Sequence, residues 1–380
     1  MGSREQRDVI VTATVATSVR VLLAPQIRMM IERGYRVSVV TGDSTEGLSS
    51  VVGDSTLSVI PMMRAISPLA DLVGLVRWVG FLRRTRPSVV VTFSPKASLL
   101  GLMAAWLTGV PQRIYSTGGL VLESTSGPRY TVLWLTERIT CLCATRVVAN
   151  SPSLAGAYAD HRLTSPRKLS STLSRKGVDA DHFDPDAETY EQISVPGPPS
   201  APVIGYVGRI AHAKGLATLA QAISEVTGGG DSVRLLAVGD VEPGAEDLVA
   251  QLSESTPHFI ATGPLRDVRP AYAAMDILVL PTRREGFPNV VLEAAAMGVP
   301  AIVTDATGSR DSVTASTGMI VPVDDVDAFA KAIRGLCRGE LNTKTTGLRA
   351  RERAISEFEP SRVIGEQLDR MGLVNGECVE

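Results

Sequence analysis

Two glutamates have the residue type and spacing that most directly suggest chemistry in this sequence. Glu285 lies in a predicted turn after the apolar run 276–281, and Glu293 follows eight residues later, inside the helix expected next. In this arrangement Glu285 looks across a site into which Glu293 reaches from the helix. Two carboxylates placed in this way suit a neutral ligand that is rich in hydroxyl groups.

The start of the same helix suits an anion. Pro288 fits the first helical position, where a missing N–H costs nothing. The amides of Asn289 and Val290 then lie at a helix N-terminus and can bind a phosphate. A hydroxyl-rich ligand part held by carboxylates next to a phosphate suggests a nucleotide sugar.

Two cations precede these residues in a similar strand-and-turn pattern. Arg209 ends a predicted buried strand, and Lys214 follows five residues later, before a helix expected near Gly215. Both can face one diphosphate, whose negative charge grows when a sugar–phosphate bond breaks, so preorganised cations stabilise that transition state more than the ground state. We therefore expect no metal and no cofactor. The structural alternatives are that Arg209 pairs with Asp240 and that Glu293 is a solvated helix residue.

Five segments, taken together and in this order, resemble the motifs of the retaining glycosyltransferases of family 4. They are KGVD at 176–179, VGRIAHAKG at 207–215, LAVGD at 236–240, TGP at 262–264 and REGFPNVVLEA at 284–294. The resemblance covers residues 170–370 closely and the N-terminal part more loosely. It implies the GT-B fold, an α/β architecture of two facing Rossmann-like domains with parallel sheets and an interdomain cleft.

The resemblance also implies roles for single residues. It assigns catalysis to Arg209 and Lys214 on the diphosphate and to Glu285 on the hydroxyls of the donor sugar, and it places Glu293 on the ribose. The donor is implied to be a UDP-sugar most often, although the base itself is not readable from the sequence. The expected donor-binding residues are Gly208, Gly263, Phe287, Pro288, Asn289, Val290 and Glu293.

The composition is that of a globular protein. The 380 residues exceed one ordinary core and suit two domains, and 44% of them are hydrophobic against 21% charged. The four Cys have no metal-like spacing, so we expect a reducing compartment, with Cys141 and Cys143 packed in a core. No signal peptide and no membrane span are expected, and the sequence predicts a cytoplasmic protein.

Apolar β-branched runs alternate with helical patterns, as a parallel sheet covered by helices requires. We expect an acceptor-binding domain at 1–185, a Pro- and Gly-rich linker at 186–202, a nucleotide-sugar-binding domain at 203–360, and at 361–380 a helix that crosses back to the first domain and a tail. The predicted strands are 9–15, 36–41, 88–93, 113–116 and 146–149 in the first domain, and 203–207, 232–238, 259–261, 277–280 and 301–304 in the second.

Charge is unevenly distributed along the chain, although the net charge is only −2. Residues 1–185 hold 21 Lys and Arg against 13 Asp and Glu, whereas residues 186–380 hold 17 against 27. A basic half indicates an anionic partner, either a membrane surface or a pyrophosphate-linked acceptor. The stretch 69–86, with Trp78, Phe81 and four arginines, could lie on such a membrane or pack on the sheet. No nucleic acid is expected, because aromatics are not interleaved with the basic residues.

Two segments of the first half bear on the acceptor. Lys96 follows a capping Ser94 and a proline, and this segment resembles one found in members that extend undecaprenyl-diphosphate-linked sugars. The turn 117–119 stands where many members carry a histidine, so a histidine base is not expected, and the leaving phosphate can take the acceptor proton instead. Glu123 can make an acceptor contact or lie in a surface loop. The expected acceptor-side residues are Lys96, Thr117, Gly118 and Gly119.

The sequence as a whole predicts a retaining hexosyltransferase. It would move a hexose or N-acetylhexosamine from a UDP-sugar to a polyprenyl- or lipid-phosphate-linked intermediate of cell-surface glycan or glycolipid synthesis, at the inner face of a membrane. Two alternatives stay open, namely a natural-product glycosyltransferase with a soluble acceptor and a UDP-sugar 2-epimerase. An oxidoreductase is disfavoured, since no Gly-x-Gly-x-x-Gly follows a strand.

Overall fold

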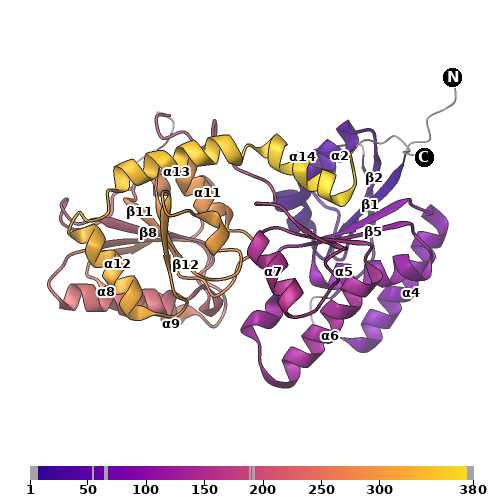
Figure 1. The fold of residues 1–380 in the computed structure, drawn as a ribbon, viewed down its shortest axis with the longest axis horizontal. Coiled ribbons are helices and arrows are strands. Elements are labelled where there is room, and N and C mark those ends of the chain that lie inside the picture. Colours follow the sequence, from indigo (N-terminus) through magenta and orange to yellow (C-terminus); the bar gives the residue numbers. More distant parts are fainter. Residues whose placement is uncertain (1–6, 54, 64–66, 188–189, 191–192, 375–380) are drawn as a thin grey trace. The chain divides into compact units, whose positions relative to one another are not determined.

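The computed structural model describes residues 7–374, apart from 54, 64–66, 188–189 and 191–192. These residues form two compact α/β units (Figure 1). The first unit comprises the described chain up to Lys176 together with the residues from Ser361 onward, and the second unit is Gly177–Pro360. Each unit has its own hydrophobic core, so we describe the two separately.

The structure places the boundary between the units after Lys176, whereas the sequence analysis placed it after residue 185. Gly177 packs closely within the second unit: a Cβ there would lie 2.3 Å from the Phe358 carbonyl oxygen. The Val178 amide donates to that same oxygen at 2.8 Å. The described residues between 177 and 202 therefore group with the second unit. Outside the described residues lie four positions of the expected linker, 188–189 and 191–192, and the expected tail, 375–380.

The described part of the first unit holds one parallel sheet of seven strands. Its strands are β1 (Asp8–Ala13), β2 (Arg36–Thr41), β3 (Thr56–Val59), β4 (Val89–Thr92), β5 (Gln112–Thr117), β6 (Arg146–Ala149) and β7 (Leu169–Ser171). They lie in the order β3-β2-β1-β4-β5-β6-β7, and each neighbouring pair is parallel. The helical segments of this unit are α1 (Ala16–Ser18), η1 (Val19–Leu23), α2 (Ala24–Glu32), α3 (Ser49–Val52), α4 (Pro68–Thr85), α5 (Pro95–Leu107), η2 (Val121–Ser124), α6 (Gly127–Cys143), α7 (Pro152–Asp160) and α14 (Pro360–Met371).

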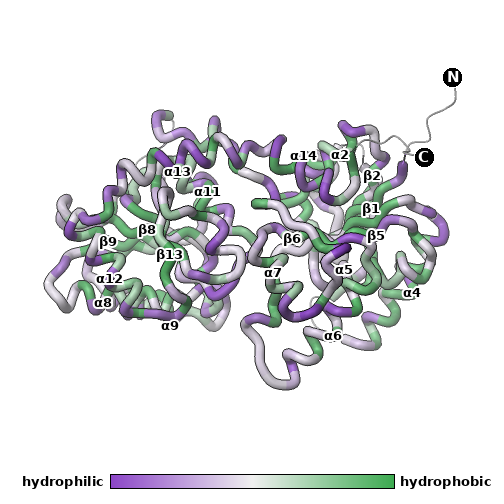
Figure 2. The backbone as a smooth tube through the Cα atoms, in the orientation of Figure 1, coloured by the Kyte–Doolittle hydropathy of each residue, from purple (hydrophilic) through white to green (hydrophobic). Residues whose placement is uncertain are grey.

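Helices cover both faces of this sheet, which is why its central strands are continuous apolar runs (Figure 2). Along β1 the side chains alternate: Val9 and Val11 belong to the core that includes residues of α2 and α14, whereas Ile10 belongs to the core that includes Trp78 of α4. The chain-terminal helix α14 lies beside α2 (Figure 1), and Arg33 binds Asp369 at 2.7 Å. The helix expected near the end of the chain, from Pro360 to Met371, thus packs within the first unit.

The described part of the second unit holds a parallel sheet of six strands. They are β8 (Val203–Val207), β9 (Arg234–Val238), β10 (Phe259–Ala261), β11 (Ile277–Leu280), β12 (Ala301–Thr304) and β13 (Gly318–Val321), in the order β10-β9-β8-β11-β12-β13. The helical segments are η3 (His212–Lys214), α8 (Leu216–Gly228), α9 (Glu246–Ser255), α10 (Arg269–Ala273), α11 (Asn289–Ala296), η4 (Arg310–Ser312), α12 (Val326–Cys337) and α13 (Thr343–Glu357).

The ten strands predicted from the sequence are all present, with ends that differ by at most two residues. Three further strands, β3, β7 and β13, were not predicted. All three lie at an edge of their sheet, where a strand needs no continuous apolar run, and β3 and β7 contain no fully buried residue. Two parallel α/β sheets with crossover helices confirm the predicted fold class.

Each sheet has one position where the strand order reverses, between β1 and β4 in the first unit and between β8 and β11 in the second. In open parallel sheets, ligands bind beyond the carboxyl ends of the strands at this position. The loops after these four strands are therefore the places at which to look for a functional site.

Helix α4 packs one side on its own unit and exposes the other to solvent. Trp78 points inward and is fully buried, while four other apolar side chains of the helix face solvent: Leu69, Leu72, Val73 and Val76. The basic residues Arg77, Arg83 and Arg84 are exposed as well. No helix within the described ranges combines the length and apolar character needed to cross a bilayer.

Candidate active site

The strand-order reversal of the second unit brings two predicted catalytic residues together. Lys214 follows β8 and Glu285 follows β11, and the Lys214 Nζ lies 2.5 Å from the Glu285 Oε1. The two side chains are 21% and 17% exposed. This ion pair is therefore mostly withdrawn from water but still reachable at the carboxyl edge of the sheet.

Two glycines allow the loops that carry this pair to approach each other. Gly215, directly after Lys214, has a φ of 69° and lies so close to the end of β11 that a Cβ would be 1.9 Å from the Pro281 carbonyl oxygen. Gly308 packs against the turn at Glu285, whose amide donates to the Thr307 carbonyl at 2.8 Å. The backbone thus fixes both charged residues from their neighbouring loops.

Arg209 lies at the same edge but has a different partner. Its Nη1 is 2.9 Å from the Glu242 Oε1, and 64% of the arginine side chain is exposed. The structure thus pairs Arg209 with Glu242 and not with Asp240, which was the structural alternative considered from the sequence. An exposed ion pair of this kind contributes little to stability, so Arg209 can exchange Glu242 for a ligand anion at low cost.

The carboxyl ends of β8, β9 and β10 carry one glycine each, and all three have positive φ values: 150° at Gly208, 142° at Gly239 and 70° at Gly263. Neighbouring loops touch here, because a Cβ on Gly239 would lie 2.0 Å from the Gly208 carbonyl oxygen. The Gly239 amide in turn donates to the Gly263 carbonyl at 3.0 Å. The predicted donor-binding residues Gly208 and Gly263 therefore form one row of backbone at which a flat ligand group can approach closely.

A buried tyrosine, Tyr206 of β8, supports the charged residues. Its hydroxyl donates to the Arg209 carbonyl at 2.7 Å. Burial raises the pKa of Tyr206, and the nearby Glu285 carboxylate raises it further. The hydroxyl therefore stays neutral and holds the loop that carries Arg209.

Helix α11, which carries Glu293, starts one residue later than predicted. Pro288 occupies the N-cap position rather than the first helical position, and its carbonyl accepts the Val291 amide at 3.2 Å. Asn289 and Val290 are then the first two residues of the helix, and both are half-buried. Gly298 follows the C-cap with a φ of 73°, as expected for a helix stop.

Glu293 is held by a residue that the sequence analysis missed. The Tyr272 hydroxyl donates to the Glu293 Oε2 at 3.0 Å, and Tyr272 itself is fully buried. Burial, with a smaller contribution from Glu293, raises the pKa of Tyr272. Glu293 is therefore a half-buried, oriented carboxylate and not a solvated helix residue. A tyrosine five residues before the strand that precedes the motif gave no signal by itself.

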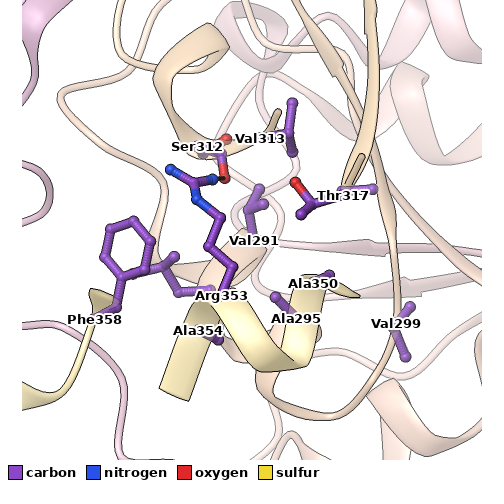
Figure 3. Close-up of a pocket in the computed structure, with 12 residues that line it drawn as sticks. Val291, Ala295, Val299, Ser312, Val313, Thr317, Ala350, Arg353, Ala354 and Phe358 are labelled. Atoms are coloured by element: carbon purple, nitrogen blue, oxygen red, sulfur yellow. Dashed lines mark hydrogen bonds between the residues drawn. The ribbon is translucent and has the colours of Figure 1, made fainter. Parts of the chain in front are cut away.

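Phe287 and Pro288, in the turn between Glu285 and α11, are packed into the second unit. Both are buried, and the Phe287 ring lies 5.7 Å from that of Phe358. Figure 3 shows a pocket between α11 and α13 in which Arg353 reaches toward Ser312, whose carbonyl accepts from the guanidinium at 2.9 Å. This packing holds the turn 285–288 against the second unit. The Phe287 side chain thus supports the turn from within the second unit, and donor contacts of Phe287 and Pro288 stay a prediction.

Acidic and sulfur ligands do not gather elsewhere in the described part of the chain. No group of three or more His, Cys, Asp or Glu there is arranged to hold a metal ion. Cys141 and Cys143 are buried, as predicted, and carry free thiols. Donor binding without a metal remains a prediction.

The predicted acceptor-side residues lie at the carboxyl edge of the first unit's sheet, where Lys96 and the expected capping residue Ser94 have partners that differ from expectation. The Lys96 ammonium lies 2.6 Å from the Asp71 Oδ2 of α4, and only 10% of its side chain is exposed. Ser94 occupies the N-cap position of α5 but does not cap it. Its hydroxyl instead contacts the Thr14 amide and hydroxyl, both at 2.7 Å, and so joins the ends of β1 and β4.

The turn 117–119 follows β5 and is anchored from beneath. Thr117 is buried, and its hydroxyl lies 2.7 Å from that of Tyr158. Tyr158 also donates to the carboxylate of Glu137, whose pKa is raised by burial. Gly119 has a φ of 147°. This buried chain fixes Thr117 at the edge of the sheet.

Comparison with known proteins identifies the family. The sequence matches the family described as glycosyl transferases group 1 over residues 201–338 and the glycosyl transferase 4-like domain over residues 18–170. It is 33% identical over 365 residues to the capsular polysaccharide biosynthesis glycosyltransferase CapM of Staphylococcus aureus, with 94% of each chain covered. The chain is a glycosyltransferase of the family 4 type.

Other relatives of this glycosyltransferase differ in the donor that their names state. A GDP-mannose-dependent alpha-mannosyltransferase of Mycolicibacterium smegmatis is 34% identical over 68% of this chain and 66% of that one. A UDP-Gal:alpha-D-GlcNAc-diphosphoundecaprenol alpha-1,3-galactosyltransferase of Escherichia coli is 28% identical over 72% of each chain. The solved structure of Anabaena Alr3699/HepE in complex with UDP matches 97% of this chain and all of that chain with a TM-score of 0.73 at 16% identity. The glycosyltransferase therefore has the GT-B fold.

Proposed function

We propose that this glycosyltransferase moves a hexose or N-acetylhexosamine from a UDP-sugar to a polyprenyl- or lipid-phosphate-linked acceptor, with retention at the anomeric carbon. The observation that carries the proposal is the Lys214–Glu285 pair at the strand-order reversal of the second unit. It combines a cation for a diphosphate with a carboxylate for sugar hydroxyls at the edge where open parallel sheets bind nucleotides. Glu293, oriented by Tyr272, would accept the ribose hydroxyls.

In the proposed reaction the bond between the sugar C1 and the donor phosphate oxygen breaks, and the electron pair leaves with the diphosphate. Lys214 and Arg209 would stabilise the charge that develops there. The acceptor hydroxyl oxygen forms the new bond to C1 on the same face, and its proton passes to the leaving phosphate oxygen. This route needs no protein base, which agrees with the lack of a histidine at 117–119.

Relatives support the class of donor and acceptor. The E. coli relative is named for a UDP-linked donor and a diphosphoundecaprenol acceptor, and the S. aureus relative for capsular polysaccharide synthesis. The mycobacterial relative is named for GDP-mannose, so the nucleotide is the first point to test. A soluble natural product as acceptor and 2-epimerisation of the donor are the competing activities.

The test is a donor panel. The purified chain is incubated with UDP-glucose, UDP-galactose, UDP-N-acetylglucosamine and GDP-mannose, with and without a chelator, and released nucleotide is measured. We expect release from one UDP-sugar, unaffected by the chelator, and a loss of about 10²-fold or more in Lys214→Ala. The exposed Lys331 provides the control variant Lys331→Ala. Release from GDP-mannose alone, or activity that stops with the chelator but survives Lys214→Ala, contradicts the proposal.

The stereochemistry is checked on the product. Proton NMR of the glycoside formed should show the anomeric configuration of the donor. An inverted product excludes the proposed same-face route. Conversion of the donor sugar in the absence of any acceptor identifies a 2-epimerase.

We also propose that α4 docks this glycosyltransferase on an anionic membrane. Leu69, Leu72, Val73 and Val76 recur at helical spacing and face solvent, and Leu69 is 81% exposed. Arg77, Arg83 and Arg84 continue the exposed side of the helix toward its C-terminus. An apolar stripe beside arginines suits the boundary between acyl chains and acidic headgroups. A helix that is not transmembrane could thus bring the first unit to a lipid-linked acceptor.

Liposome cosedimentation tests this docking. The wild type should sediment with anionic but not with neutral vesicles, because each basic residue near the surface contributes about 1 kcal/mol that salt weakens. The triple change R77E/R83E/R84E should release the protein while hydrolysis of free donor persists. The control K331E/R338E/K344E changes the charge by the same amount on the second unit and should leave binding intact. Equal loss in both triple variants would leave only a general charge effect and refute docking through α4.

A further inference from the structure

A half-buried arginine, Arg175, which the sequence analysis did not single out, lies at the acceptor-side edge of the first unit. With the Asn150 amide oriented so that its oxygen faces Arg175, that oxygen accepts from the Arg175 Nη2 at 3.1 Å and from Nε at 3.3 Å. The guanidinium carbon lies 5.4 Å from the centre of the Phe93 ring. The Arg175 carbonyl accepts from the Gln26 side chain at 2.9 Å. The arginine is thus held on three sides by residues of its own unit.

The fourth side of Arg175 is the predicted acceptor turn. A Cβ on Gly118 would lie 2.6 Å from the Arg175 Nη2, so only a glycine leaves room for the guanidinium there. The same Asn150 amide donates to the Thr117 carbonyl at 3.2 Å in this orientation. Arg175 therefore lies directly beneath the turn 117–119, which the sequence analysis had assigned to the acceptor.

The charge of Arg175 has no carboxylate partner. Across the described part of the chain, Arg33, Arg209 and Arg351 each pair with an Asp or Glu within 3.0 Å, whereas none pairs with Arg175. Burial lowers the pKa of Arg175 to about 10, so it is still protonated at neutral pH. Keeping a cation partly away from water without a counter-ion is costly, and the acceptors present, an amide oxygen and an aromatic face, compensate only part of that cost.

The surroundings of Arg175 suit an anion. Lys96, another cation at this edge, is already neutralised by Asp71. Helix α5 points its N-terminus to the same edge, and the hydroxyl of its N-cap Ser94 bonds to Thr14 instead of to the helix. The positive end of that helix dipole thus adds to the charge of the guanidinium. Hydroxyl and amide groups complete the edge, and they are the neighbours that a phosphate oxygen needs.

We propose that Arg175 binds a phosphate group of the acceptor at the carboxyl edge of the first unit's sheet. The planar guanidinium presents paired N–H donors that match a phosphate, which a lysine at this place would not do. The inference rests on the proposed function, because it names the part of a lipid-phosphate acceptor that the first unit recognises. It also explains why Gly118 is a glycine.

The same phosphate chemistry could come from the donor, so the experiment separates the two sources. Calorimetry measures the binding of inorganic pyrophosphate to the intact chain in the presence of saturating UDP, which occupies the nucleotide site. The wild type should bind pyrophosphate, and Arg175→Gln should weaken this binding about tenfold or more, as expected for the loss of charge-assisted hydrogen bonds. UDP affinity, measured separately, should stay unchanged in Arg175→Gln.

Arg113 provides a matched control. It lies on β5 of the same sheet, and its guanidinium donates to the Cys143 and Val110 carbonyls at 2.7 and 2.6 Å, at the opposite end of the strand. Arg113→Gln should bind pyrophosphate as the wild type does. Gly118→Ala is a second test variant, because its methyl group displaces the Arg175 guanidinium without removing a charge, and it should weaken pyrophosphate binding as well. Thermal unfolding shows that each variant is folded.

Each of three results overturns the inference. The first is that the UDP-saturated wild type binds no pyrophosphate, and the second is that Arg175→Gln binds pyrophosphate as tightly as the wild type. The third is that Arg175→Gln loses affinity for UDP, which would assign the phosphate contact to the donor. A failure of the proposed function appears elsewhere, as a wild type that hydrolyses no UDP-sugar. The two outcomes are read in different assays and remain distinguishable. In transfer assays, Arg175→Gln should raise the KM for a diphosphate-linked acceptor and leave the KM for an alkyl glycoside of the same sugar unchanged.

Discussion

The Lys214–Glu285 pair should have separable effects on stability and on activity. Breaking a fully buried ion pair by removing one partner costs about 3–5 kcal/mol, whereas an exposed pair contributes about 0–1 kcal/mol. With side chains 21% and 17% exposed, this pair lies between those limits. We therefore expect Lys214→Met and Glu285→Gln each to lower the free energy of unfolding by about 2 kcal/mol.

The double variant decides what these losses mean. In K214M/E285Q both charges are gone, so no unpaired charge remains, and the loss should be about 2 kcal/mol again and not the sum of the two single losses. Turnover should behave differently, because it needs both groups on the donor: all three variants should lose about 10²-fold or more.

Urea unfolding followed by far-UV circular dichroism measures the stability. The three tryptophans, Trp78, Trp106 and Trp134, all lie in the first unit, so their fluorescence reports that unit alone and shows whether the change is confined to the second. Arg334→Met is the matched control, since it breaks an exposed pair with Glu225 at 3.8 Å and should cost under about 1 kcal/mol. If the double variant loses the sum of the two single losses in unfolding free energy, the two side chains do not stabilise the fold as a pair. If the double variant recovers turnover, the two residues do not act on the donor.

Three further predictions concern the residues that position the site. Tyr272→Phe removes the hydroxyl that donates a hydrogen bond to Glu293, and it should weaken UDP binding between about two- and tenfold with little change in turnover. Glu293→Gln should weaken UDP binding more. Equal UDP affinity in wild type and Tyr272→Phe contradicts a role for this hydrogen bond in UDP binding. Burial raises the pKa of Glu137 above its ordinary 4.5, so the folded chain binds the extra proton and wild-type stability should fall as pH rises from 4.5 through the raised value. Melting curves of Glu137→Gln should lack that fall, and parallel pH profiles would show that Glu137 is not the group. Gly215→Ala puts a methyl group 1.9 Å from the Pro281 oxygen and should lower the free energy of unfolding in urea by about 2–4 kcal/mol. The control Gly230→Ala should lower it by about 1 kcal/mol, because φ there is 93° and no atom lies within 4 Å.

Much of the fold could be predicted because buried parallel strands are continuous apolar runs. Residues 203–207 and 277–280 show this pattern, and the structure has strands with those same bounds. The strands β3 and β7 were missed for the same reason: each lies at a sheet edge, where partial exposure permits polar residues and erases the pattern. The edge strand β13 has the apolar sequence GMIV, but it is only four residues long and begins with a glycine. The boundary after Lys176 was missed because it depends on a contact with Phe358, far along the chain.

The sequence by itself determined the types and local settings of the charged residues of the second unit. Arg209 and Lys214 come after one strand, and Glu285 and Glu293 come after another, because a short motif encodes a strand end, a turn and a helix start together. Local chemistry of this kind needs no knowledge of neighbouring strands, so a single sequence can carry it.

Only the tertiary structure decided which residues meet. Lys214 reaches Glu285 because the strand order places β8 beside β11, and Tyr272 reaches Glu293 from another helix. Lys96 is neutralised by Asp71 on α4, and Arg175 fits beneath Gly118 because β5, β6 and the chain after β7 converge at one edge. Each of these contacts joins distant positions, and pairing across such distances is set by strand order and side-chain packing, which no local pattern records.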